Sequence, residues 1–176
     1  MIPMLSDSLR TWAEVDLDAV EQNFMAARNH LPKNMKLLVT VKANAYGHGA
    51  LTVAKLLEGK ADYFALAAMD EAVQLRQAGI RTPLLVLGPV LPADYERAAK
   101  YDVTLTVSTL AEAKAISDLG EKITVHFALD TACPVSAFPP RKQPHKRSGR
   151  QRNCPAFMPR ASLATLPWQT AKIKVM

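Results

Sequence analysis

Five short apolar runs recur at nearly even spacing along the first 130 residues of the chain. Successive runs begin 26, 21, 19 and 20 residues apart. Uninterrupted apolar runs of this length are typical of strands buried on both faces of a parallel sheet, and each parallel strand needs a crossover segment before the next. The repeat therefore predicts an α/β fold with strands at Leu37 to Val41, Tyr63 to Ala68, Leu84 to Leu87, Val103 to Val107 and Ile123 to Leu129.

The segments between these runs have helical patterns. The clearest is Asp70 to Gly79, which has an acidic start and a glycine stop. The period of about 20 residues favours a (β/α)8 barrel of the TIM type over a doubly wound sheet, and about five barrel strands make an incomplete barrel. Further helices are expected at Ala50 to Leu57, Pro92 to Lys100 and Leu110 to Leu119.

The chain opens with a predicted strand at Thr11 to Asp16. The pattern Asp18-x-x-Glu21 then predicts a capped helix, which Pro32 ends. The sequence contains no run of 18 apolar residues and no signal-peptide pattern at its N-terminus, so a soluble, cytoplasmic protein is expected.

Composition divides the chain near Thr131. All 16 acidic residues lie at or before Asp130, and residues 1–131 carry a net charge of −3. Residues 132–176 carry +9, with no acid, seven of the 12 prolines and both cysteines. Two segments with different compositions share one chain, and we predict a folded part at 1–131 and a basic, Pro-rich, disordered tail at 132–176.

Lys42 directly follows the first buried run, so its amine is expected at the carboxyl end of a strand, where α/β proteins place their chemistry. A neutral lysine amine can attack a carbonyl carbon. Tyr46 follows on a glycine-flanked turn, from which a phenol can reach the same edge. The alternative is a lysine that extends its charged end from the strand into water.

The stretch Val-Lys-Ala-Asn-Ala-Tyr-Gly-His-Gly at residues 41–49 resembles the pyridoxal-phosphate attachment motif of bacterial alanine racemases. The resemblance extends over about three quarters of the chain, but over only about the first third of a typical family member. It implies the family's TIM-type barrel, incomplete here, with the C-terminal β domain missing. Further similar stretches lie at residues 11–19, 70–72, 84–88 and 129–131.

The resemblance also implies roles for individual residues. Lys42 matches the lysine that holds pyridoxal 5'-phosphate covalently and acts as one of two catalytic bases, and Tyr46 matches the tyrosine that binds the cofactor phosphate. The implied reaction is the interconversion of L- and D-alanine, which supplies D-alanine for peptidoglycan. In the intact family a homodimer brings a tyrosine, the second base, from the C-terminal domain; for this chain a dimer is in doubt.

The sequence departs from the family after Thr131. The family continues Gly-Met-x-Arg-Leu-Gly-Phe, whereas this chain continues Ala-Cys-Pro-Val-Ser-Ala-Phe at residues 132–138. Back-translated and read from the third base of the Ala132 codon, these residues permit Met, Pro or Ser, Arg, Leu, Gly and Phe in that order. The motif is thus permitted in the neighbouring reading frame, and we interpret residues 132–176 as an out-of-frame tail on a truncated, inactive racemase fragment.

Other functions have weaker support. Another member of the pyridoxal-phosphate barrel superfamily, a decarboxylase or a cofactor-homeostasis protein, is the alternative enzyme. A non-catalytic remnant whose basic tail binds polyanions weakly is the alternative of another class, because six Lys and Arg fall within residues 141–152 without an aromatic residue to stack on bases. No metal-ligand spacing is present, and neither designed nucleic-acid binding nor membrane binding is expected.

Overall fold

A computed structural model of the chain describes residues 13–128, which fall into two units, residues 13–35 and residues 36–128. The compositional boundary at Thr131 and the basic tail lie outside the described residues.

The first unit contains helix α1, Leu17–His30. Asp16 caps it, because the Asp16 carboxylate accepts from the Ala19 amide at 3.0 Å. The expected cap at Asp18 is therefore wrong by two residues: Asp18 lies in the first turn, where its charge favours the helix N-terminus. Leu31 ends the helix just before Pro32, as predicted.

The strand predicted at Thr11 to Asp16 is wrong for residues 13–16, which form no strand. Residues 11 and 12 lie outside the described residues.

The second unit is built on a five-stranded parallel sheet in the order β1-β2-β3-β4-β5. All five predicted strands are present, although most are shorter than their apolar runs. Their bounds are β1 Leu38–Thr40, β2 Tyr63–Leu66, β3 Leu84–Val86, β4 Val103–Val107 and β5 Val125–Phe127.

Helical segments follow the strands close to the predicted positions. The prediction for residues 50–57 matches α3 in full, and the segment at 92–100 divides into a short 3₁₀ turn and a helix. The bounds are α2 Lys42–Tyr46, α3 Ala50–Leu57, α4 Met69–Gln77, η1 Pro92–Asp94, α5 Tyr95–Lys100 and α6 Leu110–Asp118.

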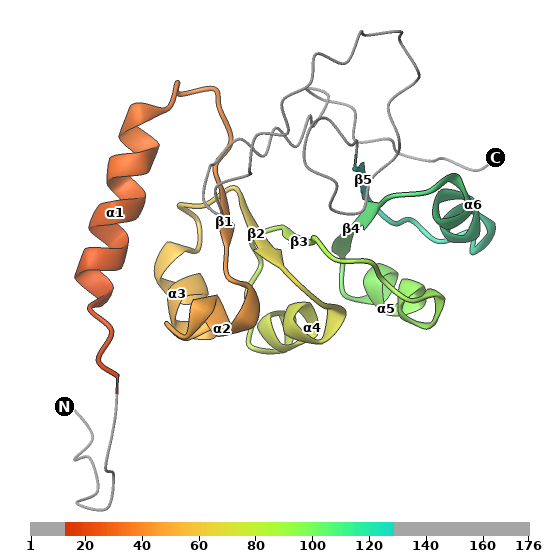
Figure 1. Ribbon diagram of the computed structural model, residues 1–176, viewed down its shortest axis with the longest axis horizontal. Helices are drawn as coiled ribbons and strands as arrows, with labels where there is room; N and C mark the ends of the chain where they lie inside the picture. The colour runs from red at the N-terminus through yellow and green to blue at the C-terminus, as the bar shows by residue number, and fades with distance from the viewer. Residues whose placement is uncertain (1–12, 129–176) are drawn as a thin grey trace, which may run out of the picture. The chain divides into compact units, whose positions relative to one another are not determined.

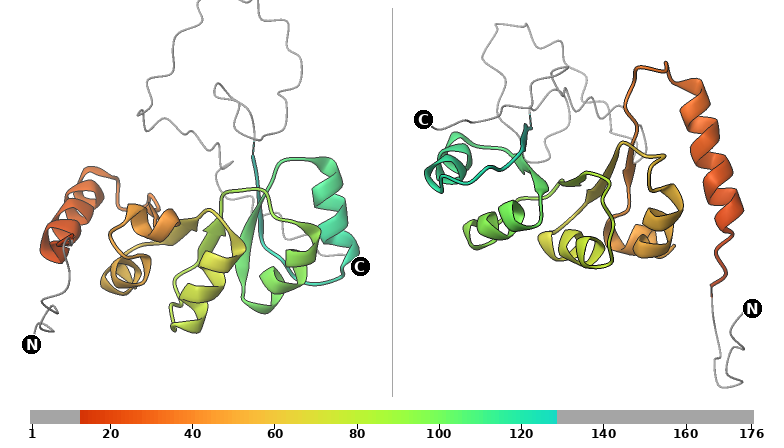
Figure 2. Two further views of the ribbon diagram at one scale, coloured as in Figure 1. Left: turned by 60° about the horizontal axis from the view of Figure 1, so that its bottom comes forward. Right: turned by 180° about the vertical axis from the view of Figure 1, so that it is seen from behind.

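Strand order and helix placement identify the architecture. Each strand pairs with the next one in sequence, whereas a doubly wound sheet reverses its order at a switch point. Helices α3 to α6 all follow the same face of the curved sheet (Figures 1 and 2). The described strands therefore form part of a β/α barrel, as predicted, and helices on both faces of an open sheet are excluded.

The core of this unit lies in the strands and the inward side of their helices. The strands supply fully buried side chains such as Phe64, Leu66, Leu84 and Leu105. Ala54 on α3 and Ala72 on α4 are also fully buried, and their small side chains let these helices lie close to the sheet.

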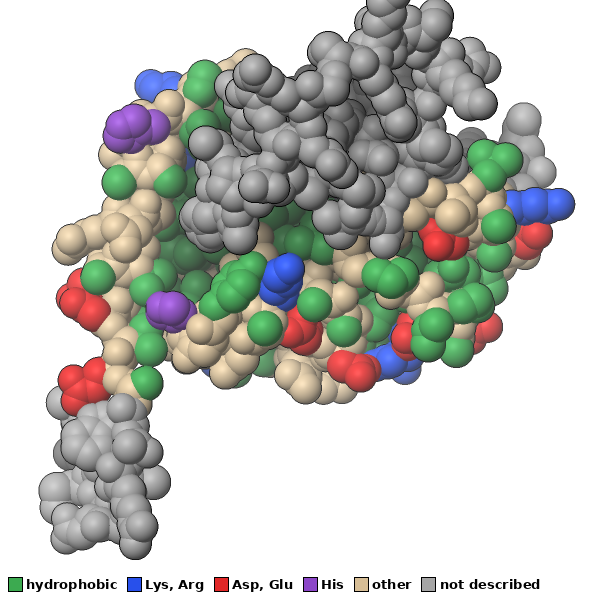
Figure 3. Space-filling view, in the orientation of Figure 1, with side chains coloured by type: hydrophobic (Ala, Val, Ile, Leu, Met, Phe, Trp, Pro, Cys, Tyr) green, Lys and Arg blue, Asp and Glu red, His purple; other side chains and the backbone are tan. Residues whose placement is uncertain are grey.

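Charged side chains of both signs are interspersed over the visible face of the described residues (Figure 3). Helices within residues 13–128 are all too short or too polar to cross a bilayer.

Candidate functional site

The sheet delivers Lys42 to its carboxyl edge. Beyond β1, the amide of Val41 still donates to the Ala65 carbonyl at 2.9 Å, so pairing with β2 continues for one residue past the strand. Val41 has none of its surface exposed. Lys42 is the first residue beyond this anchored position and is half-buried, at the strand end where the sequence places it.

Lys42 opens a turn of left-handed backbone. Ala43, Asn44, Ala45 and Tyr46 have φ angles of 51°, 55°, 53° and 54°. Four consecutive residues other than glycine in this region are rare, because the β-carbon crowds the following carbonyl at a cost of about 1–2 kcal/mol per residue. Strain of this kind persists only where the surrounding contacts overdetermine the conformation.

Asn44 and His48 supply such contacts. The Asn44 side-chain oxygen accepts from the Ala50 amide at 2.9 Å and so caps α3, although the segment's formal N-cap residue has no side chain. The His48 ring nitrogen Nδ1 lies 2.9 Å from the Ala45 carbonyl. Because a carbonyl only accepts, Nδ1 donates in this contact, and His48 helps to hold the turn in place.

Ala45 and Tyr46, neighbours in this turn, differ in their exposure to solvent. Ala45 is buried at 6% exposure, which fixes the middle of the turn against the protein. Tyr46 is 62% exposed, so its phenol is accessible at the edge of the sheet. The turn thus carries the half-buried residue Lys42 and an accessible phenol four residues later. Their amine and hydroxyl can act as a nucleophile and a hydrogen-bond donor respectively.

Glu71 on α4 also contacts this turn, which sequence reasoning missed. Its Oε1 accepts from the Ala43 amide at 2.6 Å, and its Oε2 accepts from the Ala67 amide at 2.7 Å. The sequence shows only an acidic helix start, which is a common pattern. The contact with Ala43 spans 28 residues, and no local signal marks it.

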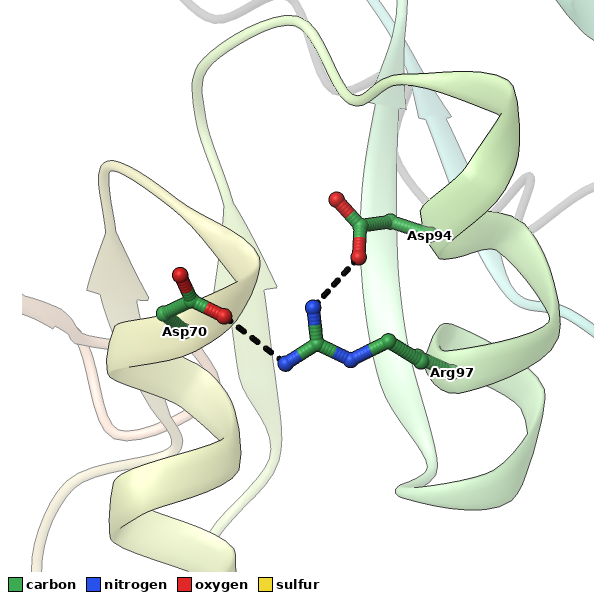
Figure 4. Close-up of polar contacts among 3 residues, drawn as sticks. All are labelled: Asp70, Asp94 and Arg97. Atoms are coloured by element: carbon green, nitrogen blue, oxygen red, sulfur yellow. Dashed lines mark hydrogen bonds and ion pairs between the residues drawn. The ribbon is translucent and has the colours of Figure 1, made fainter.

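Beside Glu71, Asp70 joins α4 to the following βα unit. Arg97 on α5 donates to the Asp70 carboxylate at 2.7 Å and to the Asp94 carboxylate at 2.5 Å (Figure 4). The hydrogen bond that Arg97 donates to Asp70, followed by the one it donates to Asp94, raises the pKa of Arg97 above its ordinary value. The guanidinium therefore ties two successive helices together near the edge that carries Lys42.

The other two histidines of residues 13–128, His30 and His126, contact groups of the fold. His126 on β5 lies across from Tyr63, with ring centroids 6.0 Å apart, and burial lowers the pKa of its imidazole. The His30 ring contacts the Ala26 carbonyl of its own helix at 2.8 Å. In the described part of the chain, no cluster of three or more His, Cys, Asp or Glu side chains could hold a metal ion.

The sequence matches racemases over most of the described residues. The family model for the alanine racemase N-terminal domain matches residues 15–134. Alanine racemase 2 of Oceanobacillus iheyensis is 47% identical over 120 residues, which are 67% of this chain and 31% of that protein. The chain thus spans about a third of the length of this curated relative.

Solved structures agree with this match. Alanine racemase of Clostridium difficile 630 superposes with a TM-score of 0.73 at 40% identity, over 77% of this chain and 37% of that one. Histidine racemase from Leuconostoc mesenteroides superposes with a TM-score of 0.63 at 30% identity, over 70% of this chain and 34% of that one. With a strand-end lysine on the expected turn and a family match over more than half its length, the chain belongs to the alanine racemase N-terminal domain family.

Proposed function

We propose that this chain is the cofactor-binding part of a pyridoxal-phosphate-dependent alanine racemase, and that Lys42 is the residue that holds the cofactor. The observation that carries the proposal is the placement of Lys42 and Tyr46 on one strained turn at the carboxyl edge of a parallel sheet. Backbone strain of this kind is concentrated at functional sites.

The residues present fit pyridoxal phosphate. A primary amine at Lys42 can bond to the aldehyde carbon with loss of water, and an accessible phenol at Tyr46 can donate to a phosphate oxygen. When bound, the cofactor supplies an electron sink that acidifies the Cα–H bond of an amino acid.

The chain's own residues would have three tasks. Lys42 would hold the cofactor and, once released by the incoming amino group of the substrate, accept or return a proton at Cα. Tyr46 would fix the phosphate end. Val41 and Ala45, both buried, would keep the intervening turn in place so that the amine meets one face of Cα.

Alanine is the substrate favoured by the relatives' printed names, and the cytoplasm, where D-alanine for peptidoglycan would be made, is the proposed location. The structural similarity to histidine racemase supports a second candidate, a racemase for another amino acid that shares this cofactor-binding part. The same turn would serve both, because its residues would act on the cofactor and the Cα proton rather than on the substrate side chain.

Reductive labelling tests the assignment of Lys42. The purified chain is incubated with a low concentration of pyridoxal phosphate, reduced with borohydride, digested and examined by mass spectrometry. We expect the pyridoxyl group on the peptide that contains Lys42, its loss in Lys42→Ala and its retention in Lys55→Ala, an exposed lysine on α3 that serves as the matched control. Labelling spread evenly over the surface lysines contradicts the proposal.

Tyr46 has its own test. Removing its hydroxyl in Tyr46→Phe deletes one hydrogen bond to a charged phosphate, so we expect the cofactor to bind about tenfold more weakly or worse. Tyr101 directly follows α5, and Tyr101→Phe serves as the control. We expect this variant to leave cofactor affinity unchanged.

A further inference from the structure

We infer that Glu71 is a positioning residue for Lys42: its carboxylate holds the first amide of the left-handed turn and thereby sets the direction in which the Lys42 side chain leaves the sheet. The inference rests on the proposed function, because it takes Lys42 as the reacting amine.

The geometry of Glu71 joins two neighbouring strand ends. Oε2 accepts from the amide of Ala67, the first residue after β2. Oε1 accepts from the amide of Ala43, the residue after Lys42. The distances, 2.7 and 2.6 Å, are those of short hydrogen bonds to an ionised carboxylate. One side chain on α4 thus binds the backbone just beyond the carboxyl ends of both β1 and β2.

The Ala43 amide needs an acceptor that its own turn does not offer. Within the turn, the Ala45 amide donates to the Val41 carbonyl at 2.8 Å, and the amides of Gly47 and Gly49 both donate to the Asn44 carbonyl. Ala43 is the first left-handed residue, and its amide is directed to Glu71 instead. Losing this contact would free the residue next to Lys42 to return to the favoured right-handed or extended region.

Glu112 occupies the position on α6 that Glu71 occupies on α4, and it accepts hydrogen bonds at the start of its own helix. Glu71 and Glu112 are each the third residue of their helices, α4 and α6, and each accepts from the first amide after the preceding strand. Glu112 also accepts from the Thr109 amide, within its own capping box. Glu71 instead reaches the Lys42 turn of the neighbouring unit, which is beyond what capping requires.

Amide exchange on the full 176-residue chain tests the role directly, with Glu71→Gln as the variant and Glu112→Gln as the matched control. Glutamine has one acceptor oxygen, so it cannot accept from both amides. We expect exchange at Ala43 to rise by about tenfold or more in Glu71→Gln and to stay unchanged in Glu112→Gln. Ser108 and Thr109 both donate to the same oxygen of Glu112, so the single oxygen of glutamine can still accept from both.

A second readout follows Lys42 itself. Reductive pyridoxylation of Lys42 is expected to slow several-fold in Glu71→Gln and to keep its wild-type rate in Glu112→Gln, even when both variants melt at similarly lowered temperatures. A purely structural role for Glu71 would make labelling follow stability in both variants alike.

A measurement on the unmodified chain does not depend on whether a variant folds. In the wild-type chain, the Ala43 and Ala67 amides are expected to be protected from exchange, because both donate to the Glu71 carboxylate. Unprotected exchange at Ala43 in the wild-type chain overturns the inference, as does an unchanged exchange rate at Ala43 in Glu71→Gln. If Lys42 is labelled at the same rate in wild type and in Glu71→Gln, the inference is wrong and the proposed function stands. If Lys42 is not labelled in wild type, both the proposed function and the inference are wrong.

Discussion

Arg76 on α4 donates from its guanidinium to the carbonyl oxygen of Asp102, 26 residues later, at 3.1 Å. The same group donates to the carbonyls of Tyr101, Ile80 and Thr82 at 2.8–3.0 Å. Burial lowers the pKa of Arg76, and the nearby carboxylates of Asp102 and Glu58 oppose that shift. One cation therefore satisfies four backbone acceptors in the loops that precede β3 and β4.

Replacing Arg76 by alanine leaves these carbonyls without their shared donor. We expect Arg76→Ala to lower the free energy of unfolding by about 2–3 kcal/mol, measured by urea denaturation, because hydrogen bonds to a charged group are among the stronger ones. Arg81→Ala, which removes an exposed arginine nearby, is the control and is expected to change little. Equal losses in both variants would contradict a specific role for Arg76.

Asn44 combines two functions in the left-handed turn, since it tolerates the conformation and caps α3. We expect Asn44→Ala to cost about 1–2 kcal/mol and to raise exchange at the Ala50 amide. Asn44→Asp keeps a side-chain oxygen in the same place and is expected to retain most of the stability. If alanine and aspartate behave alike, the side-chain oxygen is not what holds the turn.

Gly88 lies where two strand ends approach each other. A β-carbon on Gly88 would come within 2.6 Å of the Ala67 carbonyl oxygen, which belongs to the residue whose amide Glu71 holds. We expect Gly88→Ala to cost about 1–3 kcal/mol, because the contact is with backbone that cannot rotate away.

Gly47 provides the comparison for Gly88. An added β-carbon there meets no atom within 4 Å, so Gly47→Ala carries only the conformational cost of φ at 92°, about 1–2 kcal/mol. Asparagine is expected to be better tolerated than alanine at Gly47, whereas no residue with a β-carbon relieves the contact at Gly88. Thermal melting of the three variants measures this order.

The sequence predicted the five strands and most of the helices of residues 36–128, whereas the strand predicted at Thr11 to Asp16 is wrong for residues 13–16. Apolar runs and capping signals predicted all five strands and the helix at Ala50–Leu57, because burial and local hydrogen bonds determine both. The reduction of the last run to Val125–Phe127 reflects pairing, since only residues opposite Leu105 to Val107 of β4 have a ladder partner.

The shape of the Lys42 turn could not be predicted in the same way. Alanine and tyrosine disfavour left-handed backbone, and only Asn44 and the flanking glycines point toward it. The turn depends on acceptors and donors from elsewhere, above all Glu71. Lys42 was singled out by its place after a buried run and Tyr46 by its glycine-flanked turn, but their roles come from resemblance to a motif and stay predictions.

His126 makes stability depend on pH. Burial lowers the pKa of its imidazole below the ordinary value of 6.5, so the unfolded chain binds a proton more readily than the folded one. The stability that neutral His126 contributes is fully present above the unfolded pKa and is lost as pH falls below it. We expect the melting temperature to drop between pH 7.5 and pH 5.5, and His126→Gln to reduce that drop; an unchanged drop in the variant would falsify this account.

Racemisation needs proton transfer on both faces of Cα, and Lys42 supplies a base on one. The family resemblance assigns the other base to a tyrosine of a C-terminal domain. We therefore expect the 176-residue chain, loaded with pyridoxal phosphate, to exchange the Cα proton of L-alanine slowly for deuterium and to form almost no D-alanine. Loss of one general base lowers rates by roughly 10²–10⁴. Mass spectrometry of recovered alanine and a coupled D-amino-acid oxidase assay measure the two processes separately.

The reading frame provides the complementary experiment. Insertion of one G after the Thr131 codon permits the following codons to read as the family's Gly-Met-x-Arg sequence, and we expect the gene carrying it to complement a D-alanine auxotroph. Lys42→Ala in the same gene is the control and is expected to abolish growth. Rapid D-alanine formation by the 176-residue chain would contradict the need for a second base, whereas a frame-restored protein that loads cofactor on Lys42 but racemises histidine rather than alanine would favour the second candidate substrate.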